Sequence, residues 1–207
     1  MVADVPVDLP DTPFRAFVAL DVGEHVRAAL ASTILRLRRC APTGVSWVPP
    51  ENLHVSLAFL GDVSPDVAGL VDLALEDASA ATTPFTAEVG GVGWFGPARR
   101  PRVVWAGVKG GDTLSELYRR TVRGLEACGL ALDDRPFRGH ITLGRVKVRN
   151  PPGRLLRELV ELDAVRFGPI RIEALNLMRS SLSPSGARYD ILHSYPLGRG
   201  GSTDVAR

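Results

Sequence analysis

The hydrophobic pattern of this chain switches between a strand-like and a helix-like period, and so predicts a series of short elements. Residues 14–21 form an apolar run rich in side chains that favour β-structure, which predicts a buried strand. Residues 24–39 instead carry an apolar residue every three or four positions, which predicts an amphipathic helix. The apolar face of that helix consists of Val26, Leu30, Ile34 and Leu37.

The same reasoning extends over the rest of the chain. After a loop over 42–50, further strands are expected over 53–60, 85–94, 102–108, 165–178 and 189–192, and one more within 138–148. Further helices are expected over 64–80, 112–128 and 151–162. Ser64 is expected to cap the first of these, with Pro65 at its first position, and Asp112 or Thr113 to cap the second.

This order of elements occurs twice, which predicts a duplicated protein. Two segments of similar pattern, at about 14–94 and 100–178, place His54 and His140 at matching positions. A repeat of strand–helix–strand–helix–strand units predicts one bilobal α+β domain over residues 1–207. We expect two antiparallel sheets that face a central cleft, with helices on the outside and a pseudo-twofold axis between the halves.

Each half carries the same short motif, and this motif holds the candidate chemistry. The two copies are His54-Val55-Ser56-Leu57 and His140-Ile141-Thr142-Leu143. Because side chains alternate along a strand, the histidine and the hydroxyl two residues later point to one face. Across a pseudo-twofold axis the two faces are expected to meet, which brings two imidazoles and two hydroxyls into one small volume.

Such a set of groups suits phosphoryl chemistry. The unperturbed pKa of histidine is about 6.5, so one member of the His54–His140 pair can accept a proton while the other gives one. The hydroxyls of Ser56 and Thr142 can donate hydrogen bonds to non-bridging phosphate oxygens. A strained cyclic phosphate needs only water as nucleophile, so no metal is expected. The residues alone leave open which histidine is the acid and which is the base.

Two other kinds of site are disfavoured. The chain has no HxH, HxxxH or HExxH spacing and no acidic residue within either motif, which argues against a metal site. Ser56 or Thr142 as a covalent nucleophile is disfavoured because a histidine two residues away on a strand is poorly placed as a base. His25 is expected to face solvent, and His193 to be a surface or packing residue.

Composition and charge add limits to this picture. The 207 residues are 45% hydrophobic and 23% charged, as in an ordinary globular protein, and the net charge of +2 neither requires nor excludes a polyanionic partner. The N-terminus has no signal-like apolar core, and no run reaches the roughly 18 apolar residues needed to cross a bilayer. We therefore expect a cytoplasmic protein. Cys40 and Cys128 are expected to be small packing residues, neither zinc ligands nor a disulfide.

With these residues identified, the chain resembles the 2H phosphoesterase superfamily. Within it, the resemblance is to RNA 2′,3′-cyclic phosphodiesterases, also called LigT-like proteins or 2′-5′ RNA ligases. It covers residues 14–197, and besides the two motifs it includes the segments RAFVAL (15–20), WVPPENLH (47–54), FLG (59–61), PRVVWAG (101–107) and RPFR (135–138).

The resemblance implies both the fold and the activity. It implies a bilobal protein that hydrolyses 2′,3′-cyclic phosphates on RNA ends to 2′-phosphates, without a metal or nucleotide cofactor. It favours His54 as acid and His140 as base, with Ser56 and Thr142 holding the phosphate. The same site run in reverse would join RNA ends through a 2′-5′ linkage. A monomer is expected, because the duplication already supplies both halves of the cleft.

The resemblance also implies that Phe59 and Arg145 clamp the terminal base of the RNA. Each lies five residues after its histidine, so strict alternation would point it away from the site, and a strand end, twist or bulge must redirect it. Gly144 offers a place for that. One departure is Gly139, where the family usually has proline, and we expect it to loosen the backbone before His140.

Other readings remain open at this point. Six arginines are candidates for a basic rim along an RNA backbone, or are scattered over the surface: Arg99, Arg100, Arg102, Arg135, Arg138 and Arg149. Besides the ligase reading, the chain could hydrolyse small cyclic nucleotides. A different functional class is a non-catalytic RNA-binding module with the same fold. Such a module would be expected to lack one of the motif histidines, but this chain has both His54 and His140.

Overall fold

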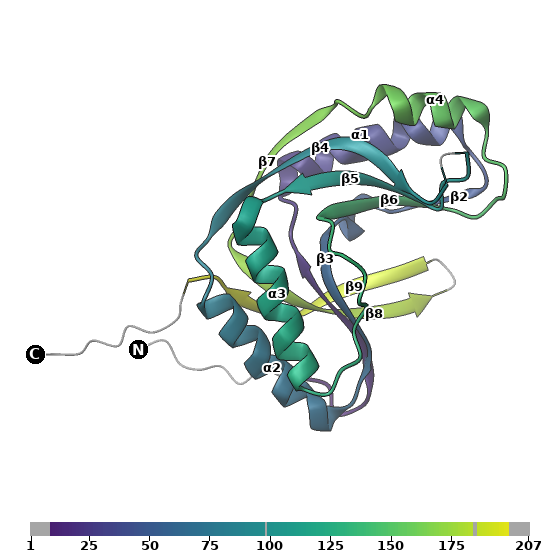
Figure 1. The fold of residues 1–207 in the computed structure, drawn as a ribbon. Helices are drawn as coiled ribbons and strands as arrows, with labels where there is room; N and C mark the ends of the chain where they lie inside the picture. The colour runs from purple at the N-terminus through teal and green to yellow at the C-terminus, as the bar shows by residue number, and fades with distance from the viewer. Residues whose placement is uncertain (1–8, 98, 184–185, 199–207) are drawn as a thin grey trace, which may run out of the picture.

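The computed structural model describes residues 9–97, 99–183 and 186–198, and these form a mixed α+β fold with antiparallel strands, as predicted (Figure 1). The helices are α1 (Glu24–Cys40), α2 (Pro65–Ala80), α3 (Gly111–Ala127), α4 (Gly153–Glu161) and the 3-10 turn η1 (Pro50–Asn52). The strands are β1 (Phe14–Leu20), β2 (Val45–Trp47), β3 (Val55–Val63), β4 (Phe85–Phe95), β5 (Val103–Lys109), β6 (His140–Val146), β7 (Arg166–Ile172), β8 (Ala174–Ser183) and β9 (Gly186–Pro196).

The strands lie in the order β7-β4-β5-β6-β3-β1-β8-β9, with β2 added beside β6. This order is symmetric about the junction of β6 with β3, which is where the two halves meet. The junction rests on one paired position, Val55 opposite Ile141. The two expected sheets are therefore two halves, of five strands with β2 and of four strands, that join into one continuous sheet at a single contact, where the two motifs begin.

Each half of the fold takes elements from both predicted repeats. Strand β4, from the first repeat, pairs with β5, and β8, from the second, pairs with β1. The helices follow the same rule, since α1 packs beside α4 and α2 beside α3. The halves in space therefore do not coincide with the segments 14–94 and 100–178, because the last strand of each segment crosses to the other half.

Several boundaries differ from the sequence prediction. The single strand expected over 165–178 is wrong, because the chain breaks at Glu173 into β7 and β8. Strand β7 is at one end of the strand order, and β8 is the last but one at the other. The strand expected over 53–60 continues through Gly61, which has a positive φ of 69°. The loop expected over 42–50 contains β2, and the strand expected over 189–192 is the longer β9.

The predicted helix caps are also partly wrong. Ser64 occupies the N-cap position of α2 with Pro65 following, but its side chain makes no capping hydrogen bond. Helix α3 begins earlier than expected, with Gly110 at the N-cap in place of Asp112 or Thr113. The φ of Gly111 is 61°, a value that glycine reaches at little cost, so the glycine pair sets the start of this helix.

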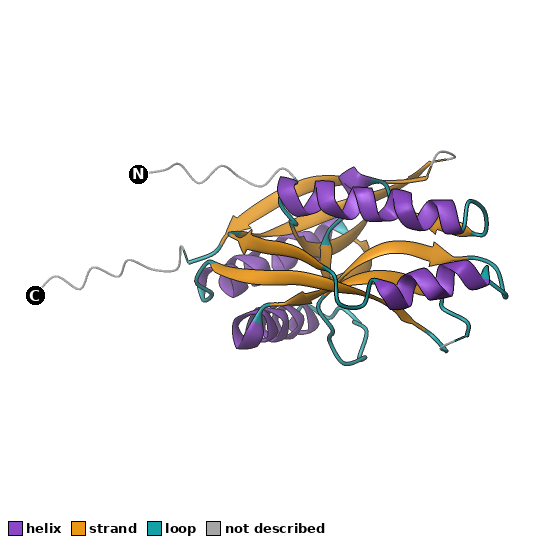
Figure 2. Cartoon of the chain, turned by 90° about the horizontal axis from the view of Figure 1, so that it is seen from above, coloured by secondary structure: helices purple, strands orange, loops and turns teal. Residues whose placement is uncertain are grey.

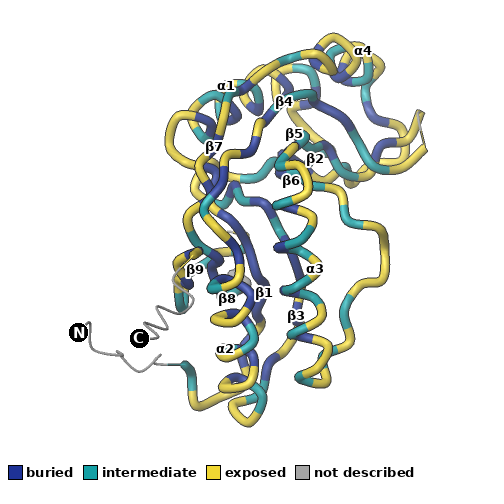
Figure 3. The backbone as a smooth tube through the Cα atoms, turned by 60° about the vertical axis from the view of Figure 1, so that its left-hand side comes forward, coloured by how far each residue is buried: buried dark blue, intermediate teal, exposed yellow. Residues whose placement is uncertain are grey.

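One continuous hydrophobic core holds both halves together. Each helix contributes a leucine with no exposed surface, and these are Leu37, Leu75, Leu125 and Leu159. Burying such a side chain stabilises the fold by about 1.5–3 kcal/mol relative to leaving it exposed. The helices flank the strands on the outside (Figure 2), and buried residues concentrate along the strands (Figure 3). Buried side chains from both halves therefore pack around the junction of β3 and β6.

Candidate active site

The two motif histidines lie at the junction of the two half-sheets. His54 immediately precedes β3 and His140 is the first residue of β6, so each adjoins one member of the Val55–Ile141 pair. Antiparallel pairing through that position sets each histidine across from the hydroxyl residue of the other motif, His54 from Thr142 and His140 from Ser56. The expected convergence of the two motifs is what the sheet topology produces.

Both imidazole rings are anchored in the same way. The Nδ1 of His54 lies 2.7 Å from the Asn52 carbonyl oxygen, and the Nδ1 of His140 lies 2.7 Å from the Arg138 carbonyl oxygen. A carbonyl oxygen only accepts, so each Nδ1 carries its proton and donates it. The Nε2 atom of each ring is therefore the one that takes up and releases a proton.

Aromatic side chains hold each ring from the side. His54 contacts Phe17, at 4.9 Å between ring centroids, and Tyr189, at 5.4 Å with the rings edge to face, and these two rings also contact each other. His140 has one such neighbour, Phe95, at 4.9 Å and also edge to face. Both histidines are therefore fixed through a backbone hydrogen bond and a ring contact, and His54 is held on more sides.

Burial and nearby positive charge lower the pKa of both histidines. For His54, burial has the largest effect, and the charges of His140, Arg145 and Arg27 act in the same direction. For His140, burial again comes first, followed by the guanidinium groups of Arg145, Arg138 and Arg135. The carbonyl that accepts from each Nδ1 partly opposes this by stabilising the charged ring. Arg145 lowers the pKa of both histidines, so a single cation affects the charge state of both rings.

Two matched bulges redirect the residues five positions after each histidine. Strand β3 carries an extra residue at Leu57 relative to β1, and β6 carries one at Leu143 relative to β5. An extra residue reverses the alternation of faces, so Phe59 and Arg145 turn to the side of the hydroxyls. The expectation of a bulge is confirmed, but it lies before Gly144. That glycine instead makes room for Trp47, whose ring would be 2.6 Å from a methyl group there.

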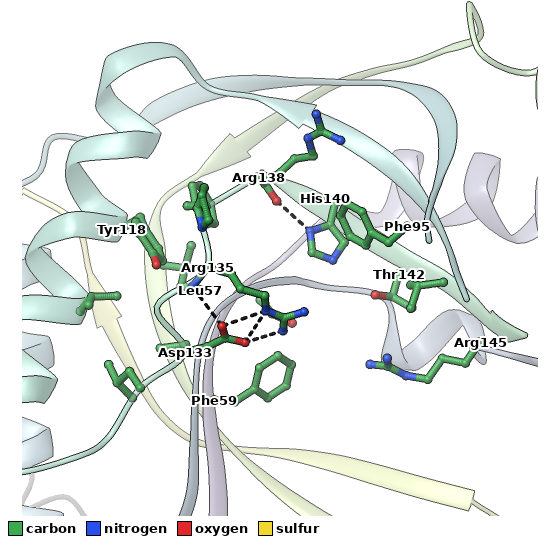
Figure 4. Close-up of a pocket in the computed structure, with 17 residues that line it drawn as sticks. Leu57, Phe59, Phe95, Tyr118, Asp133, Arg135, Arg138, His140, Thr142 and Arg145 are labelled. Carbon is green, nitrogen blue, oxygen red and sulfur yellow. Dashed lines mark hydrogen bonds and ion pairs between the residues drawn. The ribbon is translucent and has the colours of Figure 1, made fainter. Parts of the chain in front are cut away.

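These side chains line a pocket of about 650 Å³. The candidate residues on its wall are His140, Ser56, Thr142, Phe59 and Arg145. Figure 4 shows His140, Thr142, Arg145 and Phe59 around the same space, and the Phe59 side chain is 59% exposed. A volume of this size is typical of a small-molecule site, for which about 300–1,000 Å³ is usual.

His54 does not line that pocket but a second one of about 170 Å³, together with Asn52, Arg27 and Tyr189. The two histidines are close enough that the charge of His140 lowers the pKa of His54. The rings therefore interact electrostatically across the junction. Of the four motif residues expected in one volume, Ser56, His140 and Thr142 line the larger pocket and His54 does not.

Two residues that support the first motif were missed in the sequence. Arg27, on α1, donates hydrogen bonds to the carbonyl oxygens of Pro50 and Leu53 at 2.9 and 3.0 Å and pairs with Asp21. Asn52 donates to the carbonyl oxygen of Ala187 at 2.8 Å, which ties the turn before His54 to β9. No local pattern could reveal them, because their partners lie elsewhere in the sequence.

The backbone before the second motif is not loosened by glycine, contrary to expectation. The N–H of Val108 donates to the Gly139 carbonyl oxygen at 2.9 Å. A methyl group at Gly139 would lie 2.6 Å from the Val108 carbonyl oxygen. Glycine therefore permits the close approach of this segment to β5, and it holds His140 near the sheet.

Of the other residues singled out in the sequence, only a few lie at the larger pocket. Of the six arginines proposed for a rim, Arg135 and Arg138 line the larger pocket, whereas the others do not. His25 is exposed, and His193 packs edge to face on Tyr195. Cys40 and Cys128 are free, half-buried thiols. Within the described ranges, no group of three or more His, Cys, Asp or Glu could hold a metal ion, and no helix is long and apolar enough to span a membrane.

The chain is similar in sequence to known proteins over most of its length. Residues 26–183 match the family described as the 2′-5′ RNA ligase superfamily. The chain is 33% identical to the RNA 2′,3′-cyclic phosphodiesterase of Methanothermobacter thermautotrophicus over 183 residues, or 88% of this chain and 98% of that protein. It is 36% identical to the protein of the same name from Aeropyrum pernix over 169 residues, or 79% of this chain and 94% of that one.

Solved structures show the same fold. A crystal structure of a Thermus thermophilus protein superposes with a TM-score of 0.75 at 31% identity, over 90% of this chain and 98% of that one. The structure of Escherichia coli LigT complexed with 3′-AMP superposes with a TM-score of 0.67 at 26% identity, over 89% of this chain and 98% of that one.

Proposed function

This chain belongs to the 2′-5′ RNA ligase superfamily, and from that premise we propose that it hydrolyses 2′,3′-cyclic phosphates at RNA ends. The product is a 2′-phosphomonoester, and the reaction uses two histidines and no metal ion. Relatives that are 33% and 36% identical and are named RNA 2′,3′-cyclic phosphodiesterases support this substrate. The described residues support the chemistry.

The reaction is a single displacement at phosphorus. His140 takes a proton from water on its Nε2, and the water oxygen forms the new bond to phosphorus. The bond from phosphorus to the 3′ oxygen breaks, and His54 gives its Nε2 proton to that oxygen. The 2′ oxygen keeps the phosphate. One proton enters the enzyme and one leaves it, so the next turnover requires only proton exchange between the two rings and solvent.

The hydroxyls and the cation stabilise the charge that develops. Ser56 and Thr142 donate hydrogen bonds to the non-bridging oxygens, where negative charge grows in the transition state. Arg145 adds a positive charge near the same oxygens. Its guanidinium and the exposed ring of Phe59 hold the terminal base between them, and stacking of this kind accepts any base.

One observation carries the proposal. Two short motifs from different parts of the chain adjoin a single paired position, Val55–Ile141, with both Nδ1 atoms bound to carbonyl oxygens. This arrangement leaves two free Nε2 atoms, which is what paired acid and base catalysis requires.

The experiment is hydrolysis of an oligoribonucleotide ending in a 2′,3′-cyclic phosphate, with EDTA present. We expect turnover to a 2′-phosphate by the wild type, and a loss of kcat of about 10²–10⁴-fold in His54→Ala and in His140→Ala. His25→Ala, an exposed histidine, is the matched control and should keep full activity. An inert wild type, or full activity in either motif variant, would show the proposal to be wrong.

The family description favours a second activity at the same site, the joining of RNA ends through a 2′-5′ linkage. It is the reverse reaction, in which a 5′-hydroxyl strand replaces water. Adding such a strand to the assay and searching for a longer product tests it. Activity on cyclic mononucleotides with none on oligonucleotides would instead point to a small-molecule substrate.

We also propose that the protein acts as a cytoplasmic monomer. Both histidines and both hydroxyls come from one chain, so the site needs no second copy. Light scattering should therefore give a mass near 22.2 kDa at assay concentrations. A dimer under those conditions, or a membrane-bound or exported protein on cell fractionation, would overturn this part of the proposal.

A further inference from the structure

The larger pocket extends well beyond the two motifs, towards helix α3. Its far end is lined by Tyr118 and Val122, one turn apart on α3, and by Leu132 and Phe137 from the segment that leads to β6. We call these four residues the α3 recess. The rings of Tyr118 and Phe137 are stacked, with centroids 4.2 Å apart and planes inclined by 13°. The proposed hydrolysis uses none of these four side chains.

Cations separate the α3 recess from the phosphate site. Arg135 and Arg138 line the pocket and lie on either side of Phe137 in the sequence, shortly before His140, and both are exposed. In Figure 4, Tyr118 lies at one end of the pocket and Arg145 at the other, with Arg135 and His140 between them. Along the pocket, a stack of aromatic rings is thus followed by positive charge and then by the two motifs.

Arg135 is held in position by a single acidic partner. Its side chain pairs with both carboxylate oxygens of Asp133, and its backbone N–H also donates to that carboxylate. This arrangement lowers the pKa of Asp133 to about 2, so the pair stays charged near neutral pH. Because the pair is exposed, a phosphate group can compete for the Arg135 guanidinium.

We propose that the α3 recess binds the nucleoside that precedes the terminal nucleotide of the RNA. This inference rests on the proposed function, and it narrows the substrate from cyclic phosphates in general to RNA ends of two or more nucleotides. An RNA strand leaves its terminal nucleoside through a negatively charged phosphodiester and then presents a second base. The pocket offers cations and then an aromatic surface in that order, which matches a strand running from Arg145 towards α3.

The apolar character of the α3 recess fits a base better than a second phosphate. Val122, Leu132 and Phe137 give a wall without charge, and a stacked ring pair presents a flat surface. Base-on-aromatic contacts are tolerant of sequence because every base has a flat face. The site should therefore recognise the presence of a penultimate base and not its identity.

The test compares a 2′,3′-cyclic mononucleotide with a dinucleotide that carries the same cyclic end. Wild type should have a higher kcat/KM for the dinucleotide. Tyr118→Ala should remove most of that advantage, a loss of about 5- to 150-fold on the dinucleotide, with a much smaller loss on the mononucleotide. Tyr118→Phe keeps the ring and should restore the advantage. Arg135→Gln should also lower kcat/KM on the dinucleotide, and should weaken its dependence on salt.

Two controls separate a binding role from a structural one. Arg123→Ala changes an exposed cation on the same helix outside the pocket, and it should leave both substrates unaffected. A dinucleotide with an abasic penultimate position keeps the phosphodiester but lacks the base, so it should lose most of the dinucleotide's advantage in the wild type and should be turned over equally well by Tyr118→Ala. Equal kcat/KM for mononucleotide and dinucleotide in the wild type, or equal losses on both in Tyr118→Ala, would overturn the inference.

Binding of the product separates this inference from the proposed function. The dissociation constant of a dinucleotide 2′-phosphate should rise in Tyr118→Ala, whereas that of a nucleoside 2′-phosphate should not, and neither measurement needs turnover. If the wild type cleaves the cyclic mononucleotide but the dinucleotide 2′-phosphate binds no better than the nucleoside 2′-phosphate, only the α3 recess proposal fails. If it cleaves neither substrate, the proposed function fails.

Discussion

At the scale of single residues, Arg145 has two separate effects on the site. It lines the pocket opposite Phe59, where it can contact a bound nucleotide, and its charge lowers the pKa of both histidines. A cation close to an imidazole disfavours the protonated ring, because two positive charges repel each other. In the proposed reaction, substrate binding and proton transfer therefore both depend on this one guanidinium.

Replacing Arg145 should move the pH dependence of the reaction. In Arg145→Met the repulsion is absent, so the pKa of each histidine rises and the whole profile of kcat/KM against pH shifts to higher pH. Arg145→Lys keeps the charge, and its profile should stay in place even if its activity falls. Measuring kcat/KM from pH 4.5 to 9 for both variants is the check. A downward shift in Arg145→Met would contradict the assigned effect.

At the scale of elements, the site depends on small irregularities within the strands. The bulges at Leu57 and Leu143 turn Phe59 and Arg145 to the side of the hydroxyls. Gly139 lets the segment before β6 approach β5 closely enough for a 2.9 Å hydrogen bond. A regular pair of strands would keep the histidines and the hydroxyls in place but would turn Phe59 and Arg145 away from the pocket.

Gly139→Ala should therefore cost both stability and activity. The added methyl group meets a backbone oxygen that cannot move alone, so β5 or His140 must shift, and overpacking of this kind costs about 1–3 kcal/mol. We expect a lower free energy of unfolding in urea and a lower kcat, since His140 is the next residue.

The matched control is Gly69→Ala on the exposed side of α2, where a methyl group meets nothing within 4 Å. It should raise the free energy of unfolding by about 0.8–1.0 kcal/mol, because alanine is the better helix former. An unchanged or more stable Gly139→Ala protein would show that the close approach to β5 is not needed.

At the scale of the whole molecule, each half of the fold supplies one histidine, and the pKa of each histidine is lower than its ordinary value. The proposed reaction needs one neutral and one protonated ring, so we expect kcat/KM to be highest between the two pKa values of the free protein. Both values lie below 6.5. On the alkaline side the acid loses its proton, and on the acidic side the base gains one.

The profile of kcat/KM against pH should be bell-shaped with its maximum below pH 6.5. The maximum of kcat should lie at higher pH, because the negative charge of the bound phosphate favours the protonated imidazole and raises both pKa values. Steady-state kinetics on one oligonucleotide substrate give both profiles. A maximum of kcat/KM above pH 7, or a profile with only one limb, would contradict a pair of histidines with lowered pKa values.

The sequence predicted some helices and strands closely and missed others, and particular elements show the reasons. Helix α1 and strand β1 were predicted almost to the residue, because their apolar periods are long and regular. The strand expected over 165–178 was wrong because Glu173 breaks no apolar pattern, yet it separates β7 and β8 by nearly the whole width of the sheet. Strand β2 was missed because three residues carry no period, and only pairing with β6 makes them a strand.

By itself, the sequence determined the helices and most of the strands, the two matched motifs and the family, since each is local or repeated along the chain. Only the tertiary structure decided that β4 and β8 cross between halves, that the sheet joins at Val55–Ile141, and that Arg27 and Asn52 hold the turn before His54. The physical reason is the distance along the chain over which an interaction acts. The hydrophobic period of a segment indicates which face of its own strand or helix is buried. Asn52 and Ala187, by contrast, are hydrogen-bonded although they lie 135 positions apart, and no local pattern indicates such a partner.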